Sequence, residues 1–267
     1  RAMLRQFNET VAAGREGLAA PSYEPVRLLY SRESILFSEQ SHRAVLSAEE
    51  ILLQNHVPYG LLPCSADTPL AIPGGIEVLL VCDQRCLSDL QLDALVKFAK
   101  KGGRLIVTGK SGEHDELYRQ RRANPLVEAL KGCANTIRRD EADKATIRGS
   151  GWTIKVAATK EDGRRLKADL DAVWSPRVRI QAPPSVLAKV RQDGAAVYVH
   201  LVNYARDPVG PGTRIELPKR EFTSAGCTFA APMESRTPAP IAAKETEKVC
   251  VLDLPGFADY AVVRIPN

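Results

Sequence analysis

The amino-acid sequence predicts an α/β protein, in which an open parallel β-sheet with helices on both faces precedes a smaller antiparallel β-sandwich. In the first part of the chain, apolar strand-like runs alternate with helix-period segments, as in βαβ units. The run Ile76–Val81 is almost continuously apolar, which is typical of a strand buried on both faces of a parallel sheet. After Ser175 and Pro176, short β-rich runs alternate with proline and glycine turns.

Composition excludes several classes of protein. The 267 residues are 44% hydrophobic and 26% charged, which is ordinary for a folded globular chain. No apolar run approaches the roughly 20 residues that a membrane span needs, so we expect no membrane partner. The net charge is only +5 and aromatic residues make up 6%, which argues against a nucleic-acid partner. The six cysteines lack zinc-ligand spacing, so we expect buried thiols and no metal.

The chain is expected to have three parts: a lead-in helix and linker over 1–21, the α/β domain over 22–175 and the β-sandwich over 176–267. In the lead-in, Leu4, Phe7 and Val11 lie at helical spacing, and Gly14 and Gly17 follow them. The α/β pattern then opens with a strand at 26–30, a helix over 42–55 and a weaker strand at 57–62.

The helix that follows the central strand has the clearest boundaries in the sequence. Ser88 at its N-cap and Gln91 three residues later form a capping box. Gly102 and Gly103 supply the positive φ that ends a helix, and the strand Arg104–Thr108 comes next. These signals predict one complete αβ step.

Two further helices and the sandwich strands complete the predicted elements. Asn124 as N-cap and Pro125 in the first turn predict a helix, and apolar spacing predicts another over 163–174. In the last third, Val197, Val199 and Leu201 alternate with their neighbours, as in a sandwich strand. We expect strands at 178–180, 186–190, 197–202, 214–217, 249–254 and 260–265.

Polar side chains follow two neighbouring strands of the predicted sheet. Open α/β sheets bind ligands beyond the carboxyl ends of their strands, so these side chains could hold a sugar hydroxyl or an anion. The alternative is a solvated loop whose acidic residues cap a helix. The candidate ligand-binding residues are Asp83, Lys110, His114, Asp115 and Glu116.

No catalytic residue or cofactor is predicted. The loop Gly109–Gly112 lacks the glycine spacing of a P-loop and of a nucleophile elbow. The first strand-to-helix connection contains no glycine, which excludes a dinucleotide fingerprint. A Ser111–His114 pair would lack an orienting acid, and Cys82 has no evident base partner.

Three stretches carry a family resemblance. Residues 108–116, followed by 121–126, resemble the segment after a strand in glutamine-amidotransferase-like domains of bacterial glycoside hydrolases, the β-galactosidase trimerisation type. Val199-His200-Leu201-Val202-Asn203-Tyr204 resembles a strand of the β-sandwich that closes such enzymes, and the helix at 1–13 resembles the segment leading out of their catalytic barrel. The resemblance implies a flavodoxin-like sheet and places the catalytic carboxylates on an upstream barrel.

The resemblance therefore implies a non-catalytic accessory and oligomerisation region of a glycoside hydrolase. Its partners would be the upstream barrel of the same polypeptide and further copies, and because the chain begins at Arg1 we expect an upstream segment. This role predicts an exposed apolar patch on one face of 22–175. One alternative is a carbohydrate-binding module that uses the α/β crevice or the sandwich face, and another is an independent hydrolase, which lacks a nucleophile. The compartment stays open between bacterial cytoplasm, periplasm and secretion.

Overall fold

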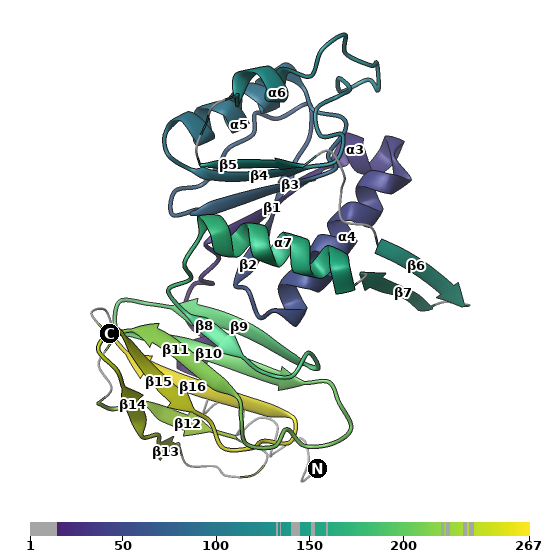
Figure 1. Cartoon of the computed structure of the whole chain (residues 1–267). Helices are drawn as coiled ribbons and strands as arrows, with labels where there is room; N and C mark the ends of the chain where they lie inside the picture. Colours follow the sequence, from purple (N-terminus) through teal and green to yellow (C-terminus); the bar gives the residue numbers. More distant parts are fainter. Residues whose placement is uncertain are drawn as a thin grey trace. The chain divides into compact units, whose positions relative to one another are not determined.

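The computed structural model describes residues 15–131, 133, 135–139, 145–150, 153–158, 160–219, 222, 225–231, 234 and 238–267 (Figure 1). The chain divides into two compact units. The parallel-sheet unit comprises Glu24–Leu52 and Tyr59–Ser175, and the sandwich unit comprises Arg1–Tyr23, Leu53–Pro58 and Pro176–Asn267. Within the predicted lead-in helix, residues 1–14 lie outside the described part of the chain, and α2 spans Arg15–Ala19.

The first unit contains a five-stranded parallel sheet in the order β2-β1-β3-β4-β5. This order is that of flavodoxin-like folds, and it confirms the predicted fold class. The central strand β3 is buried at every position, as its continuous apolar run predicts. The strands are β1 Val26–Ser31, β2 Tyr59–Cys64, β3 Val78–Cys82, β4 Arg104–Thr108 and β5 Thr136–Arg139.

Helices cover both faces of this sheet. Figure 1 shows α5 and α6 on one face and α4 and α7 on the other. On the α5 side, alternate residues of β3 and β4 pack against the apolar stripe of the helix, which includes Leu92 and Leu95. The helices are α3 Arg32–Phe37, α4 Glu39–Gln54, α5 Asp89–Lys100, α6 Pro125–Ala129 and α7 Lys160–Val173.

Both predicted helix starts are confirmed. Ser88 and Gln91 form both hydrogen bonds of the capping box, and the Asn124 side chain accepts from the Leu126 N–H at 3.0 Å. The sequence did not predict α3, β5 or the hairpin of β6 (Ala145–Ser150) and β7 (Thr153–Ala158). The helix α3 has only six residues, and its buried positions are polar, so it has no apolar stripe to reveal it.

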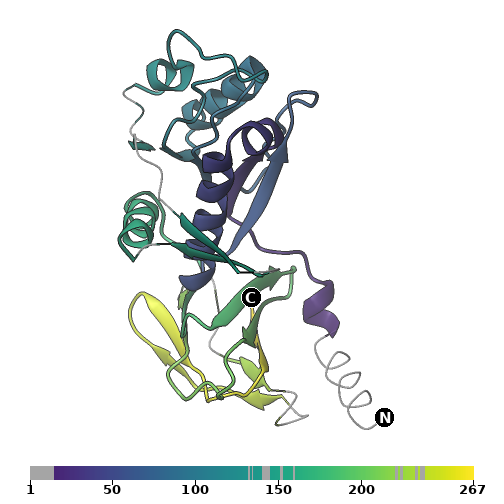
Figure 2. The ribbon, with the colours of Figure 1, turned by 90° about the vertical axis from the view of Figure 1, so that its right-hand side faces the viewer.

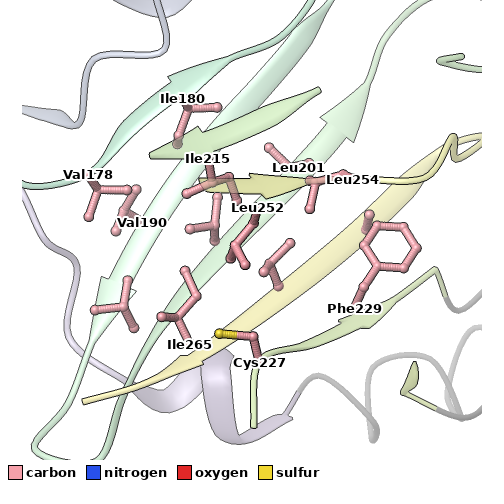
Figure 3. Close-up of a cluster of buried hydrophobic side chains, with 14 of the residues drawn as sticks. Val178, Ile180, Val190, Leu201, Ile215, Cys227, Phe229, Leu252, Leu254 and Ile265 are labelled. Carbon is pink, nitrogen blue, oxygen red and sulfur yellow. The ribbon is translucent and has the colours of Figure 1, made fainter. Parts of the chain in front are cut away.

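The second unit is the predicted antiparallel β-sandwich. Its sheets have the orders β13-β12-β16-β10-β9 and β14-β15-β11-β8. Figure 3 shows side chains of both sheets packed together, among them Leu201 and Ile265 from one sheet and Ile215 and Leu252 from the other. The strands are β8 Arg179–Gln181, β9 Val186–Gln192, β10 Ala196–Asn203, β11 Arg214–Pro218, β12 Thr228–Ala230, β13 Ala239–Pro240, β14 Ala243–Glu245, β15 Val249–Asp253 and β16 Tyr260–Pro266.

The face of β10 that points away from this core is also buried. Figure 2 shows α2 beside the sandwich, and Tyr198 lies under this helix in a cluster with Ala20 and Ala196. A Cβ atom at Gly17 would lie 2.7 Å from Cδ1 of the Tyr198 ring, so only glycine permits this approach. The N-terminal segment therefore completes the sandwich unit. None of the helices described combines the length and apolar character needed to cross a bilayer.

Candidate functional site

Buried polar residues of the parallel-sheet unit lie where its strands end and on the loops and helices that adjoin these ends. Ligand sites of open α/β sheets form at this carboxyl edge. We therefore asked whether its side chains remain available to a ligand. The residues are Ser31, Glu33, Ser34, Ser41, Asp83, Gln84, Gln91, Thr108 and Ser111.

Asp83 directly follows β3 and ties two loops together. Its side chain is 1% exposed and accepts a 2.7 Å hydrogen bond from the backbone N–H of Lys110, and Arg85 Nε lies 3.2 Å from Oδ2. Burial raises the pKa of this carboxyl group, and the hydrogen bond from Lys110 and the Arg85 charge oppose the rise. The backbone of Asp83 is left-handed, with φ of 48°, a conformation that aspartate tolerates better than most residues. The carboxylate thus holds the loop after β4 against the loop after β3.

Ser111 is engaged by the backbone. Its Oγ accepts from the Gln84 N–H at 2.9 Å and lies 2.8 Å from the carbonyl oxygen of Thr108, to which it donates. No hydrogen bond joins Ser111 to His114, so the pair considered from the sequence does not form. Gly109, the residue directly after β4, holds the left-handed turn at φ of 61° and offers no side chain as a nucleophile.

Asp115 closes a tight turn in the segment that follows. Its Oδ1 accepts from the backbone N–H groups of Leu117 and Arg119 at 3.0 and 2.9 Å, and Arg119 Nε donates to Oδ2 at 2.7 Å. Burial alone would raise the pKa of this carboxyl group, but the hydrogen bonds from Arg119 and Leu117 lower it below its ordinary value. Asp115 therefore closes a turn and caps no helix, since the next helix begins at Pro125 with Asn124 as its N-cap.

His114 anchors this turn to the loop after β3. Its N–H donates to the Arg85 carbonyl at 3.0 Å, and its own carbonyl accepts from the Leu87 N–H at 3.2 Å. Its ring stacks on Tyr118, with centroids 4.6 Å apart and planes 9° apart, and no partner of Nδ1 is found among the described residues. This stacking gives His114 a structural role in the turn.

Among the five predicted ligand residues, the hydrogen bond from the backbone N–H of Lys110 joins two, Lys110 and Asp83. Lys110 is exposed, with Nζ 3.9 Å from Glu113 Oε2, and Glu116 is half-buried. Neither a hydrogen bond nor an ion pair joins Asp83 to His114, Asp115 or Glu116. Ligand binding by these five residues stays a prediction. The carboxylates of Asp83 and Asp115 already accept hydrogen bonds from groups of the protein.

This edge also carries two cysteines, Cys64 at the end of β2 and Cys86 in the loop after β3. Among the described residues, no three or more His, Cys, Asp or Glu side chains are placed to hold a metal ion. Burial raises the pKa of Cys64 to about 12 and that of Cys86 to about 11, so both thiols stay protonated at neutral pH.

The structure adds an apolar surface that was not located from the sequence. At the end of α3 and in the turn closed by Asp115, four large apolar side chains are exposed, and the rings of Phe37 and Tyr118 lie 5.8 Å apart. The signal in the sequence was two adjacent apolar residues, 117 and 118, within a charged stretch. We call this surface the edge patch: Leu36, Phe37, Leu117 and Tyr118.

Comparisons with known proteins identify the fold. No family model and no curated protein matches the sequence. Among solved structures, α-L-fucosidase isoenzyme 2 from Paenibacillus thiaminolyticus matches with a TM-score of 0.59 and 13% identity, over 96% of this chain and 50% of that one. A rhamnosidase from Novosphingobium sp. PP1Y matches with 0.59 and 14%, over 99% and 24%. A β-galactosidase from Rahnella sp. R3 matches with 0.57 and 13%, over 93% and 42%.

The chain thus spans half the length or less of the enzymes that it matches. The match runs through both units, the parallel sheet and the β-sandwich. This likeness confirms, at the level of fold, the resemblance to a region of glycoside hydrolases that the sequence indicated.

Proposed function

We propose that this chain is a non-catalytic accessory and oligomerisation region of a glycoside hydrolase, with the catalytic barrel upstream in the same polypeptide. One observation carries the proposal. The three enzymes match 93–99% of this chain, while the chain covers only 24–50% of them. The two units together thus correspond to one part of larger glycoside hydrolases, which leaves room for a separate catalytic part.

The chemistry of the carboxyl edge supports a non-catalytic role. Most glycoside hydrolases need two carboxyl groups that flank the scissile bond, one as acid and one as nucleophile or base. The carboxylates of Asp83 and Asp115 instead accept hydrogen bonds from backbone N–H groups and lie beside arginine side chains of the same unit. Neither is placed to protonate a leaving group or to activate water.

An activity comparison tests this proposal. The 267-residue chain and a longer polypeptide that contains it would be assayed side by side on a panel of aryl glycosides. We expect hydrolysis by the longer polypeptide and none above the buffer rate by the chain alone. Hydrolysis by the chain alone would overturn the proposal. The proposal would also be overturned if the longer polypeptide hydrolysed no glycoside of a broad panel.

The alternative of a carbohydrate-binding module makes a different prediction. A sugar present at 100 times its Kd would stabilise the folded chain by about 2.7 kcal/mol. Because both edge aspartates are engaged internally, we expect mono- and oligosaccharides to leave the melting temperature of the chain unchanged. A saturable rise in Tm with one sugar class would favour the binding module instead.

A further inference from the structure

Two of the six cysteines belong to the core of the β-sandwich. Cys227 directly precedes β12 in one sheet, and Cys250 lies on β15 in the other. Each is 1% exposed, and both belong to the cluster of buried apolar side chains that fills the sandwich. Figure 3 shows the Cys227 side chain among residues of that core. The two thiols therefore enter one core from opposite sheets.

The strands that carry these cysteines meet at a corner of the sandwich. β13 and β14 are edge strands of the two sheets, and only Ile241 and Ala242 separate them in the chain. β12 pairs with β13, and β15 pairs with β14, so each cysteine lies next to a corner strand. The carbonyl of Cys227 accepts a hydrogen bond from the Ile241 N–H at 3.0 Å. Cys250 is paired with Glu245 of β14, so both cysteines lie within one strand of the place where the sheets join.

The alternation along both strands turns the two side chains inward. On β15, Cys250 and Leu252 are buried and the residues between and beside them are partly exposed. Cys227 and Phe229 are buried in the same way, with the partly exposed Thr228 between them. Burial raises the pKa of Cys227, and the charge of the Cys250 thiol raises it further. Because electrostatic interactions weaken with distance, this effect places the two sulfur atoms near each other in the core.

We propose that Cys227 and Cys250 form a disulfide bond between the two sheets when the chain folds under oxidising conditions. The co-reactant is a small-molecule disulfide, oxidised glutathione. One cysteine thiolate attacks a sulfur of this disulfide, forms a mixed disulfide and releases one glutathione thiol. The second cysteine thiolate then attacks the protein-bound sulfur of the mixed disulfide and releases the other glutathione thiol. The two protons and two electrons that the cysteine thiols lose are thus carried by the two glutathione thiols.

The exchange has to take place before the core of the sandwich closes. In the folded chain both thiols are buried, and burial raises the pKa of each, so few thiolates are present to attack a disulfide. The unfolded chain exposes both thiols to the oxidant. Once the sandwich has formed, the same burial protects the finished bond from reductants in solution. The inference is independent of the proposed function, because it concerns the covalent state of the sandwich and no glycoside.

Oxidative refolding of the full chain tests the inference. The reduced chain would be unfolded in urea, refolded with a mixture of reduced and oxidised glutathione, digested and mapped by mass spectrometry. We expect a cross-linked pair of peptides that contain Cys227 and Cys250, with the loss of two of the six thiols. The bond should resist dithiothreitol in native buffer and open when the same reductant is added in urea. The bridged chain should melt several degrees above the reduced chain, because the bond restricts the unfolded state.

Alanine variants test which cysteines are paired. Cys227→Ala and Cys250→Ala should each abolish the cross-link. Cys86→Ala is the matched control, since it removes a fully buried thiol from the parallel-sheet unit, and it should keep the cross-link. The peptide map of the unaltered chain decides the question even where a variant does not fold. Six titratable thiols after oxidative refolding, or a bond between any other two cysteines, would overturn the inference. A bridged chain that melts below the reduced chain would also overturn it, because the sandwich would then hold the bond only under strain.

Discussion

Asp83 allows the sharpest test of whether the carboxyl edge is structural. Its carboxylate is buried, accepts from the Lys110 N–H at 2.7 Å and lies beside Arg85, and its backbone is left-handed. We expect Asp83→Asn, Asp83→Gly and Asp83→Ala to destabilise the parallel-sheet unit to increasing degrees. Asparagine removes the charge, and glycine removes the hydrogen-bond acceptor. Alanine removes the acceptor and also makes the left-handed backbone of residue 83 unfavourable.

The magnitudes follow from the contacts. Burial raises the pKa of Asp83 despite its two partners, so the ionised form is not favoured by its surroundings. Asparagine keeps an acceptor for Lys110, so we expect a cost within about 1 kcal/mol. Glycine leaves the Lys110 N–H and Arg85 without the carboxylate, which costs about 2 kcal/mol. Alanine adds the left-handed backbone penalty, for a total of about 3–4 kcal/mol.

Urea unfolding followed by tryptophan fluorescence measures these costs. Trp174 is buried in the parallel-sheet unit and donates to Glu77 at 2.8 Å, so its emission reports on that unit. A shift of the midpoint at constant m-value converts directly into a change in unfolding free energy. If alanine and asparagine had equal midpoints within error, the carboxylate would hold no loop in place. Asp83 would then again be available for a ligand.

Two further predictions concern protonation and capping. Burial lowers the pKa of His56 and of His200, so protons bind the unfolded chain more readily. The stability that these histidines contribute should be complete above about pH 6.5, and the Tm should fall as the pH decreases below that value. The fall in Tm should be smaller in His200→Gln. A Tm that does not change between pH 8 and 5.5 would contradict this prediction. Asn124→Ala should cost about 1 kcal/mol by urea unfolding, because the Leu126 N–H loses its N-cap acceptor, whereas Arg122→Ala, outside the cap, should cost nothing measurable.

Elements with local signals could be predicted from the sequence. The capping box of Ser88 and Gln91 lies within four residues, and the Asn124 cap lies directly before its helix. The parallel sheet was predictable because β3 must be apolar on both faces when helices cover both. These features depend on neighbours in the sequence or on the burial of a whole strand.

Features that depend on distant contacts could not be predicted in this way. The hydrogen bond between Asp83 and Lys110 joins residues 27 positions apart. No neighbour of Asp83 in the sequence indicates that its carboxylate accepts this hydrogen bond. The burial of Tyr198 could not be predicted either. The alternation along β10 places Tyr198 on the face away from the core, and the N-terminal segment, distant in sequence, buries that face. A candidate ligand residue in a sequence becomes a structural residue once a distant backbone N–H reaches it.

The polar groups at the carboxyl edge of the sheet differ in how far the protein itself engages them. Asp83 and Ser111 bind backbone groups of the same unit, whereas Glu33 Oε2, Gln91 Nε2 and Thr108 Oγ1 are buried with no hydrogen-bond partner among the described residues. Toward solvent the edge presents charged side chains such as Lys110 and Arg119 together with the apolar side chains of Leu36, Phe37, Leu117 and Tyr118. The engaged carboxylates of Asp83 and Asp115 support the proposed non-catalytic role, and the Asp83 variants test this support directly.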